Sequence, residues 1–159
     1  MCLDLENLVE ALSLHIEDEK QPSLLYRLDD LVKRISREFG EVVGGFFFLP
    51  PHLVNRWTEI LRPLRFFFVV CPKVIDKQKK LEDTADETMI EHIRFLKDNI
   101  EGLTHICIAT GDQDFAPVIR ETVRKGLKII IIAGSYKSLS EELKRLADKD
   151  MLFILEESN

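Results

Sequence analysis

The chain has 159 residues, of which 45% are hydrophobic and 31% are charged, and its formal net charge at pH 7 is −6. This composition is typical of a soluble globular protein and predicts one domain over residues 1–159. The negative net charge argues against a protein that binds nucleic acid over its whole surface, although it is compatible with a local basic patch. We find no signal peptide, and the longest apolar runs are too short to cross a bilayer, which predicts a cytoplasmic protein without a membrane span.

The cysteines and histidines show no pattern of a zinc site or a catalytic nucleophile. No C-x-x-C pair is present, and the three cysteines lie far apart, in or beside apolar runs, which predicts reduced thiols packed as small hydrophobic side chains in a reducing compartment. The histidines lack ligand spacing, so we expect surface or packing roles for them. These residues are Cys2, Cys71 and Cys107, and His15, His52, His92 and His105.

Six short apolar segments predict β-strands. The first is only residues 1–3, directly ahead of Asp4, and the later ones are rich in β-branched and aromatic residues without clean polar alternation. Continuous apolar runs of this length are typical of strands that are buried on both faces of a parallel sheet. The later strands are predicted at residues 42–49, 66–71, 105–109, 128–133 and 151–155.

Helical patterns lie between the strands, and prolines, glycines and capping motifs mark their ends. Thr84 with Glu87, and Ser138 with Glu141, have the spacing of capping boxes. The predicted helices run from Glu6 to about Ile16 and over residues 24–40, 51–63, 84–102, 116–126 and 138–150. The alternation predicts an α/β fold, a three-layer sandwich with a mainly parallel sheet of five to six strands and helices on both faces.

Acidic side chains follow two of the predicted strands, and ligands bind outside the carboxyl ends of the strands in such a sheet. Asp4 and Asn7 follow the first strand, and the turn 110-TGDQD-114 follows the fourth; Asp86 opens the helix that leads to the fourth. If the chain stays extended past Gly111, Asp112 and Asp114 point to the same side.

Each aspartate also has a purely structural explanation. Asp86 suits the positive end of a helix dipole, Asp112 suits a turn, and Asp114 suits a helix cap. Their convergence on one edge nevertheless predicts a cation site, because grouped carboxylates repel unless a cation or protons neutralise them. Oxygen ligands of this kind suit Mg²⁺ or Mn²⁺.

The string 110-TGDQDFAPVIRETVRKGLKIIIIAG-134 resembles the signature TGDxDFxPxIxxxxxxGxxV of the NYN domain family, a branch of the PIN-like nucleases. The opening 3-LDLENL-8 resembles that family's first-strand DxxN element, and Asp86 in 83-DTADE-87 resembles its acidic position before the fourth strand. Asp83 is the alternative at that position. The resemblance extends over nearly the whole chain.

The resemblance implies a PIN-like, Rossmann-like fold and a metal-dependent ribonuclease that hydrolyses RNA phosphodiester bonds with Mg²⁺ or Mn²⁺. By motif position, it implies catalytic and metal-binding roles for Asp4, Asp86, Asp112 and Asp114, with Asn7 and Thr110 in support.

A basic loop after the third predicted strand suits phosphate binding, and an aromatic residue after the fifth suits base stacking. The alternative for the loop is a solvated segment. The expected substrate is single-stranded or structured RNA. Exposed sheet edges would also allow a homodimer. The candidate RNA-binding residues are Lys73, Lys77, Lys79, Lys80, Arg120, Arg124 and Tyr136.

Two other functions compete with the nuclease. The fold could serve as a catalytically weak or inactive RNA-binding or protein-interaction module, which the overall acidity favours. It could instead be a phosphatase of the haloacid dehalogenase type, with Asp4 as nucleophile and 111-GDQD-114 as the acidic metal motif. That family has a second aspartate where this chain has Glu6.

Overall fold

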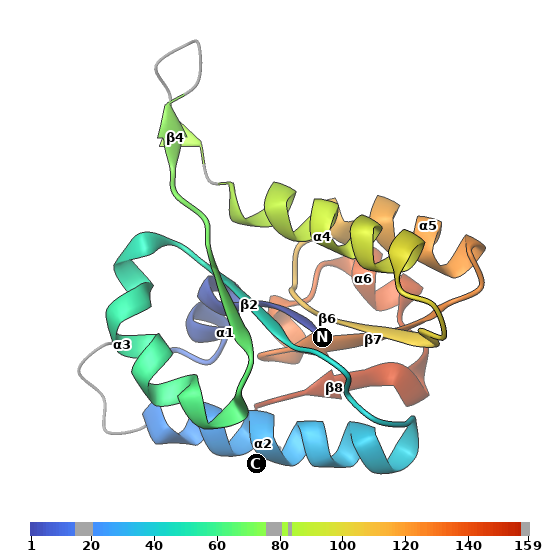
Figure 1. Cartoon of the computed structure of the whole chain (residues 1–159), viewed down its shortest axis with the longest axis horizontal. Coiled ribbons are helices and arrows are strands. Elements are labelled where there is room, and N and C mark those ends of the chain that lie inside the picture. Colours follow the sequence, from blue (N-terminus) through green and yellow to red (C-terminus); the bar gives the residue numbers. More distant parts are fainter. Residues whose placement is uncertain (15–20, 76–80, 83, 157–159) are drawn as a thin grey trace.

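The centre of the protein is a six-stranded sheet in which every pairing is parallel. The computed structural model describes residues 1–14, 21–75, 81–82 and 84–156. The strand order is β3-β2-β1-β6-β7-β8, and Figure 1 shows the sheet between two layers of helices. The strands are β1 (Cys2–Asp4), β2 (Phe46–Leu49), β3 (Phe67–Val70), β6 (His105–Ala109), β7 (Lys128–Ala133) and β8 (Leu152–Ile154). The predicted α/β sandwich with a mainly parallel sheet is thereby confirmed.

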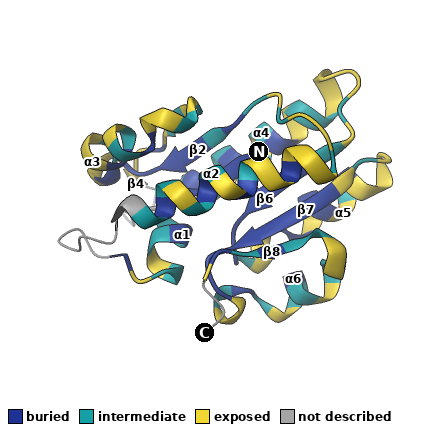
Figure 2. Cartoon of the chain, turned by 90° about the horizontal axis from the view of Figure 1, so that it is seen from below, coloured by how far each residue is buried: buried dark blue, intermediate teal, exposed yellow. Residues whose placement is uncertain are grey.

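In the described part of the chain, three α-helices cover each face of the sheet. The core on one face is built with α1 (Leu5–Ala11), α2 (Gln21–Glu38) and α3 (Pro51–Leu61). The core on the other face is built with α4 (Ala85–Asn99), α5 (Ala116–Arg124) and α6 (Glu141–Leu146). Figure 2 shows the buried face of α2 turned toward the sheet and its exposed face turned to solvent. No described helix is long and apolar enough to span a bilayer.

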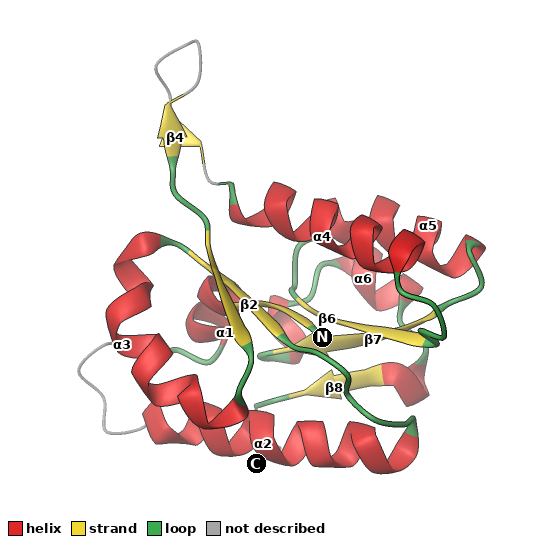
Figure 3. Cartoon of the chain, in the orientation of Figure 1, coloured by secondary structure: helices red, strands yellow, loops and turns green. Residues whose placement is uncertain are grey.

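Several short elements connect these layers (Figure 3). A small antiparallel hairpin, β4 with β5, lies within the segment for which the sequence predicted only a loop, and it projects beyond the start of α4. The short elements are β4 (Val74–Ile75), β5 (Leu81–Glu82), and the 3-10 helices η1 (Arg62–Leu64), η2 (Gln113–Phe115), η3 (Tyr136–Ser138) and η4 (Lys149–Met151).

The strands β6 and β7 are apolar on both faces because both faces are covered. In β6, Ile106 and Ile108 pack into the core with α4, whereas Cys107 and Ala109 pack into the core with α2. Successive side chains of a strand point to opposite faces, so a strand between two helical layers needs an unbroken apolar run. This is the physical reason that the continuous runs identified the sheet.

Several local predictions need correction. The helix predicted from Glu6 to about Ile16 is Leu5–Ala11, and within the range predicted as one helix at 138–150 the α-helix is only Glu141–Leu146. The strand predicted at 42–49 begins only at Phe46, and Gly45 before it lies so close to Phe66 that a Cβ would be 2.3 Å from that ring. Neither predicted capping box forms. The Thr84 hydroxyl donates to the carbonyl of Pro72 at 2.7 Å, and Ser140, rather than Ser138, caps α6. Side-chain capping thus depends on which partner the folded chain places nearby, which spacing alone does not specify.

The order of the sheet reverses between β1 and β6. From β1 the chain builds outward through β2 and β3, and it then returns to the other side of β1 to add β6, β7 and β8. In parallel α/β sheets, the crevice outside the carboxyl ends of the strands at such a switch point is the usual ligand site. Here that position lies after Asp4 at the end of β1 and after Ala109 at the end of β6.

Candidate functional site

The chain turns sharply where β6 ends. Thr110 is fully buried, and its hydroxyl accepts a hydrogen bond from the Asp112 N–H at 3.2 Å. Asp112 Oδ1 in turn accepts the Asp114 N–H at 2.9 Å and caps η2. The chain is extended at Asp112 but enters η2 at Gln113, so the condition under which Asp112 and Asp114 would point to the same side is not met. Asp112 is half-buried and Asp114 is exposed.

A buried aromatic ring, that of Phe115, fixes the turn on its core side. Phe115 is fully buried in the core with α4 and α5, and Pro117 lies in the first turn of α5. Proline suits this position because its fixed φ matches the helix and its missing N–H has no partner there anyway. Phe115 thus anchors the turn in the core, and Pro117 helps to begin α5.

Asp4 and Asn7 connect the first strand to this turn. Asp4, which is 8% exposed, caps α1 by accepting the Asn7 N–H on Oδ1 at 3.0 Å. Asn7 Oδ1 then accepts the Gly111 N–H at 3.1 Å across the switch point. The short first strand therefore still holds Asp4, because β1 is paired on both sides, with β2 and with β6.

The serine-rich loop 134–140, which follows β7, forms another wall of the site, and of its residues only Tyr136 was predicted to have a role there. The Gly111 carbonyl accepts the Ser140 N–H at 2.9 Å. A Cβ on Gly111 would lie 2.0 Å from the Ser138 carbonyl oxygen, so only glycine allows this approach. Ser135 and Ser138 cap each other in η3. The position of this loop after a parallel strand was the available signal.

Asp86 and Asp114 line one cavity, of about 440 Å³, between α4 and the turn that leads into α5. Asp86 is half-buried in the first turn of α4, as predicted. The cavity also contains Glu87 and Glu91, which lie four residues apart on α4 and were not predicted as site residues. The other lining residues are Glu87, Ile90, Glu91, Arg94, Pro117 and Val118.

The guanidinium of Arg94 is held at one end of this cavity. It donates two hydrogen bonds to the Glu121 carboxylate, each at 3.0 Å. This fork lowers the pKa of Glu121 below its usual value, chiefly through the hydrogen bond from Arg94. Arg94 is therefore paired with α5, and it leaves the cavity lined by an excess of carboxylates.

The carboxylates at this edge are suitable ligands for a divalent cation, since Mg²⁺ and Mn²⁺ prefer carboxylate oxygens. Asp86 and Asp114 share the cavity, whereas Asp4 and Asp112 each use Oδ1 to accept a backbone N–H. Within the described residues, no three His, Cys, Asp or Glu side chains are grouped closely enough to hold a metal ion. Coordination of one ion by more than two of these carboxylates would therefore require their side chains to move closer together.

The candidate RNA-binding residues that the structure describes lie on separate elements. Lys73 is exposed just before β4, and Lys77, Lys79 and Lys80 lie outside the described residues, as does Asp83. Arg120 is paired with Glu142. Arg124 ends α5, which runs back from the acidic edge by about 1.5 Å per residue, so it lies away from the aspartates.

Tyr136 lies in the serine-rich loop 134–140, in η3. It is 56% exposed, and the Lys144 ammonium is 4.8 Å from the centre of its ring. The same ammonium donates to the Glu141 carboxylate at 2.7 Å, so the exposed ring is the feature that suits stacking on a base.

The cysteines and His92 are packed away from this chemistry. All three cysteines are buried thiols that form no disulfide among the described residues, and burial raises the pKa of Cys2 and of Cys107 to about 11. The His92 ring packs against Phe46 at 4.3 Å and against Phe48 at 5.5 Å. By contrast, His52 lies in the first turn of α3, at the same edge of the sheet as Asp4. Its Nε2 atom is 3.7 Å from the Glu6 carboxylate.

Comparisons with known proteins agree with this architecture. An uncharacterized protein of Methanocaldococcus jannaschii is 27% identical over 119 residues, which cover 75% of this chain and 45% of that protein, so the chain spans less than half of that relative. A crystal structure of a protein of unknown function from Vibrio parahaemolyticus superposes with a TM-score of 0.68 at 14% identity, covering 96% of this chain and 88% of the other, and this likeness shows the fold.

The sequence model of the NYN domain matches residues 3–155. The matched range includes the Asp4 and Asn7 pair, Asp86 and the turn from Thr110 to Asp114. The chain belongs to the NYN domain family, a branch of the PIN-like nucleases.

Proposed function

We propose that this protein is a metal-dependent ribonuclease that hydrolyses RNA phosphodiester bonds at the carboxyl edge of its sheet. The observation that carries the proposal is the turn 110–114, which places Asp114 in one cavity with Asp86 at the edge where the sheet order reverses. Membership of a nuclease family supports the same reaction class.

The four aspartates would bind the cation, and the elements that carry them would fix their positions. Asp86 and Asp114 would hold it from the two sides of their cavity, and Asp4 and Asp112, whose Oδ1 atoms accept backbone N–H groups, would complete the site with Oδ2. When bound, Mg²⁺ or Mn²⁺ supplies a hydroxide-like water at neutral pH and neutralises charge on a phosphoryl oxygen. Such chemistry needs no cysteine or serine nucleophile.

Support for an RNA substrate comes from the rim of the site. Tyr136 offers an exposed aromatic face, with Lys144 beside it, and Lys73 is exposed on the segment that follows β3. Stacking platforms next to cations suit single strands, whose bases are accessible. The net charge of −6 implies that phosphate contacts are local.

A catalytically inactive RNA-binding or interaction module is the second candidate. The observation that favours it is that no three metal-ligating side chains are already grouped among the described residues. Such a module would bind RNA without consuming it.

The test is cleavage of a labelled single-stranded RNA with Mn²⁺, Mg²⁺ or EDTA. We expect cleavage with metal, loss of cleavage with EDTA, and loss in Asp112→Asn with an unchanged melting temperature. Asp98→Asn is the matched control, since Asp98 is an exposed aspartate at the other end of α4 that faces Lys125. Binding without cleavage would establish the second candidate, and equal cleavage by both variants would overturn the proposal. Trapping by beryllium fluoride at Asp4 would indicate a phosphatase instead.

A further inference from the structure

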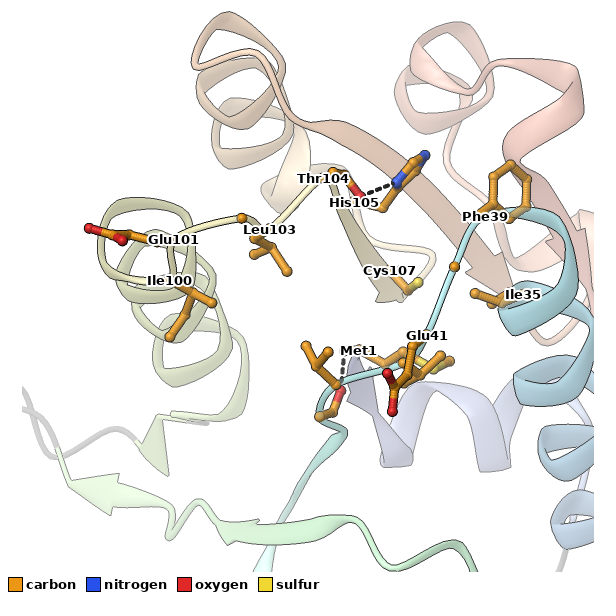
Figure 4. A pocket seen from close by; sticks show the side chains of 15 residues that line it. Met1, Ile35, Phe39, Glu41, Ile100, Glu101, Leu103, Thr104, His105 and Cys107 are labelled. Carbon is orange, nitrogen blue, oxygen red and sulfur yellow. Dashed lines mark hydrogen bonds between the residues drawn. The ribbon is translucent and has the colours of Figure 1, made fainter.

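The acidic cavity at the carboxyl edge of the sheet is lined by charges of both signs. Its lining combines Asp86 and Asp114 with the guanidinium of Arg94. The cavity of about 400 Å³ at the amino edge differs from it, because its walls are mainly apolar and the Glu101 carboxylate points outward (Figure 4). Metal binding does not account for Arg94, since a cation in the wall repels a bound metal ion.

Arg94 is fixed in place by α5. Its Nε and Nη2 atoms donate to the two oxygens of the Glu121 carboxylate, each at 3.0 Å, and Lys97 Nζ lies 3.7 Å from the same carboxylate. A fork of two parallel bonds fixes the plane of a guanidinium. Arg94 is therefore preorganised, and less side-chain entropy is lost when it binds a further group.

A second edge of the Arg94 guanidinium remains available. The fork to Glu121 uses the edge formed by Nε and Nη2, and Nη1 donates no hydrogen bond in the described part of the chain. Arg94 lines the cavity and its side chain is 47% exposed, so a ligand in the cavity can reach this edge. The paired N–H groups of a guanidinium match the oxygens of a phosphate.

The position of Arg94 on α4 suits a phosphate beside the scissile one. Asp86 and Arg94 are eight positions apart on the helix, so their Cα atoms are separated by about 12 Å along its axis. Ile90 lies between them and gives the cavity an apolar wall that a ribose or a base can contact. The proposed metal ion already neutralises the scissile phosphate, whereas the next phosphate of the strand needs another cation.

The neighbouring carboxylates are compatible with a bound phosphate. Asp86 and Asp114 are proposed metal ligands, so their charge is neutralised when the ion is bound. Glu87 and Glu91 also line the cavity, but both are exposed, and water and salt screen exposed charges.

Positive charge exceeds negative charge beyond Arg94. The ion-pair network there joins the cations Arg94, Lys97 and Lys125 to the carboxylates of Glu121 and Asp98. On the basis of the proposed ribonuclease activity, we propose that the RNA strand runs along α4 from the metal site and that Arg94, held by Glu121, binds the phosphate next to the scissile one.

The first test compares substrates that differ by one phosphate. The dinucleotide UpU has one phosphodiester, whereas pUpU and UpUp add a terminal phosphate on the 5′ or the 3′ side. With Mn²⁺, we expect kcat/KM of the wild type to be about tenfold higher for one of these two than for UpU. Arg94→Gln should lose this gain and cleave UpU at the wild-type rate. Arg94→Lys, which keeps the charge without the planar fork, should retain part of the gain.

Arg34→Gln is the matched control. Arg34 also donates to a carboxylate, that of Glu38 at 2.8 Å, but it lies on α2 at the other face of the sheet. This variant should keep the full gain. If Arg94→Gln lowers cleavage of UpU and of the phosphorylated dinucleotides equally, or lowers neither, the proposal is overturned.

A binding measurement separates this inference from the proposed activity. In the Asp112→Asn background, binding of a labelled twelve-nucleotide oligouridine is followed by fluorescence anisotropy over a range of salt concentrations. Adding Arg94→Gln should reduce the slope of log Kobs against log salt by about 0.7, as expected for one phosphate contact on a single strand. The same addition of Arg34→Gln should leave the slope unchanged.

The outcomes of the two measurements are distinguishable. A reduced slope supports the Arg94 contact even if the wild type cleaves no RNA. An unchanged slope in a protein whose wild type cleaves RNA overturns this inference and leaves the proposed activity standing. Absence of RNA binding by every variant overturns both.

Discussion

Asn7 Oδ1 accepts a hydrogen bond from the Gly111 N–H at 3.1 Å and thereby joins residues that are 104 positions apart. Asp4 holds the start of α1 by accepting the Asn7 N–H. The acidic turn after β6 is thus positioned from the first strand. The DxxN spacing near the start of the chain makes sense as one unit: the aspartate caps the helix and the asparagine three residues later reaches across the switch point.

We predict that Asn7→Leu destabilises the protein by about 1–3 kcal/mol, because it leaves the Gly111 N–H without an acceptor. RNA cleavage should fall as well, since the turn that carries Asp112 loses its tie to α1. Asn7→Asp keeps an oxygen at the same position and serves as the control for stability. Denaturant unfolding measures both variants, and equal stability of Asn7→Leu and the wild type would show that the bond contributes little.

Replacing Gly111 by alanine should be far more damaging than the same change at Gly44. A Cβ at Gly111 meets the Ser138 carbonyl oxygen at 2.0 Å, whereas a Cβ at Gly44 meets only the Phe46 ring at an ordinary 3.5 Å. We expect Gly111→Ala to cost about 2 kcal/mol or more and Gly44→Ala less than about 1 kcal/mol. Similar melting temperatures for the two variants would mean that the loop 134–140 yields easily.

Stability should fall at alkaline pH because of two buried thiols. Burial raises the pKa of Cys2 and Cys107 from 9.0 to about 11, so their contribution is fully present below the unfolded pKa and is lost as the pH rises from about 9 through 11. A shift of about two pKa units corresponds to roughly 2–3 kcal/mol per thiol. The fall in unfolding free energy over this range should be shallower in Cys107→Ala, and an unchanged slope would contradict this account.

Mn²⁺ should raise the melting temperature of the wild type, because a ligand that binds only the folded state stabilises it. At 100 times the dissociation constant the gain is about 2.7 kcal/mol. Asp86→Asn should reduce this gain, since Asp86 lines the acidic cavity, while Asp98→Asn should keep it. Equal stabilisation of all three proteins would place the bound metal elsewhere.

The strands and the family were predictable from the sequence because their signals are local. Runs such as 105-HICIA-109 and 128-KIIIIA-133 indicate strands whose two faces are both buried, and the apolar residues of both runs are buried in the structure. The turn 110-TGDQDF-115 combines a glycine, a capping aspartate and a buried aromatic residue within six positions.

The features that the sequence did not reveal depend on partners distant in the chain. Thr84 bonds to Pro72 instead of capping its own helix, and Ser140 rather than Ser138 meets α6. The proximity of Ser138 to Gly111, and the approach of Asp86 to Asp114, arise from the packing of α4 and α6 on one face of the sheet. No local pattern specifies these distances.

The most direct test of the central claim is a crystal structure of the protein with Mn²⁺, in which anomalous scattering locates the ion. The proposal predicts an anomalous peak in the acidic cavity, within coordination distance of Asp86 and Asp114, with the Asp4 and Asp112 carboxylates drawn toward it. A fully occupied ion bound elsewhere, or no ion at this edge in crystals of a protein that cleaves RNA with Mn²⁺, would contradict it.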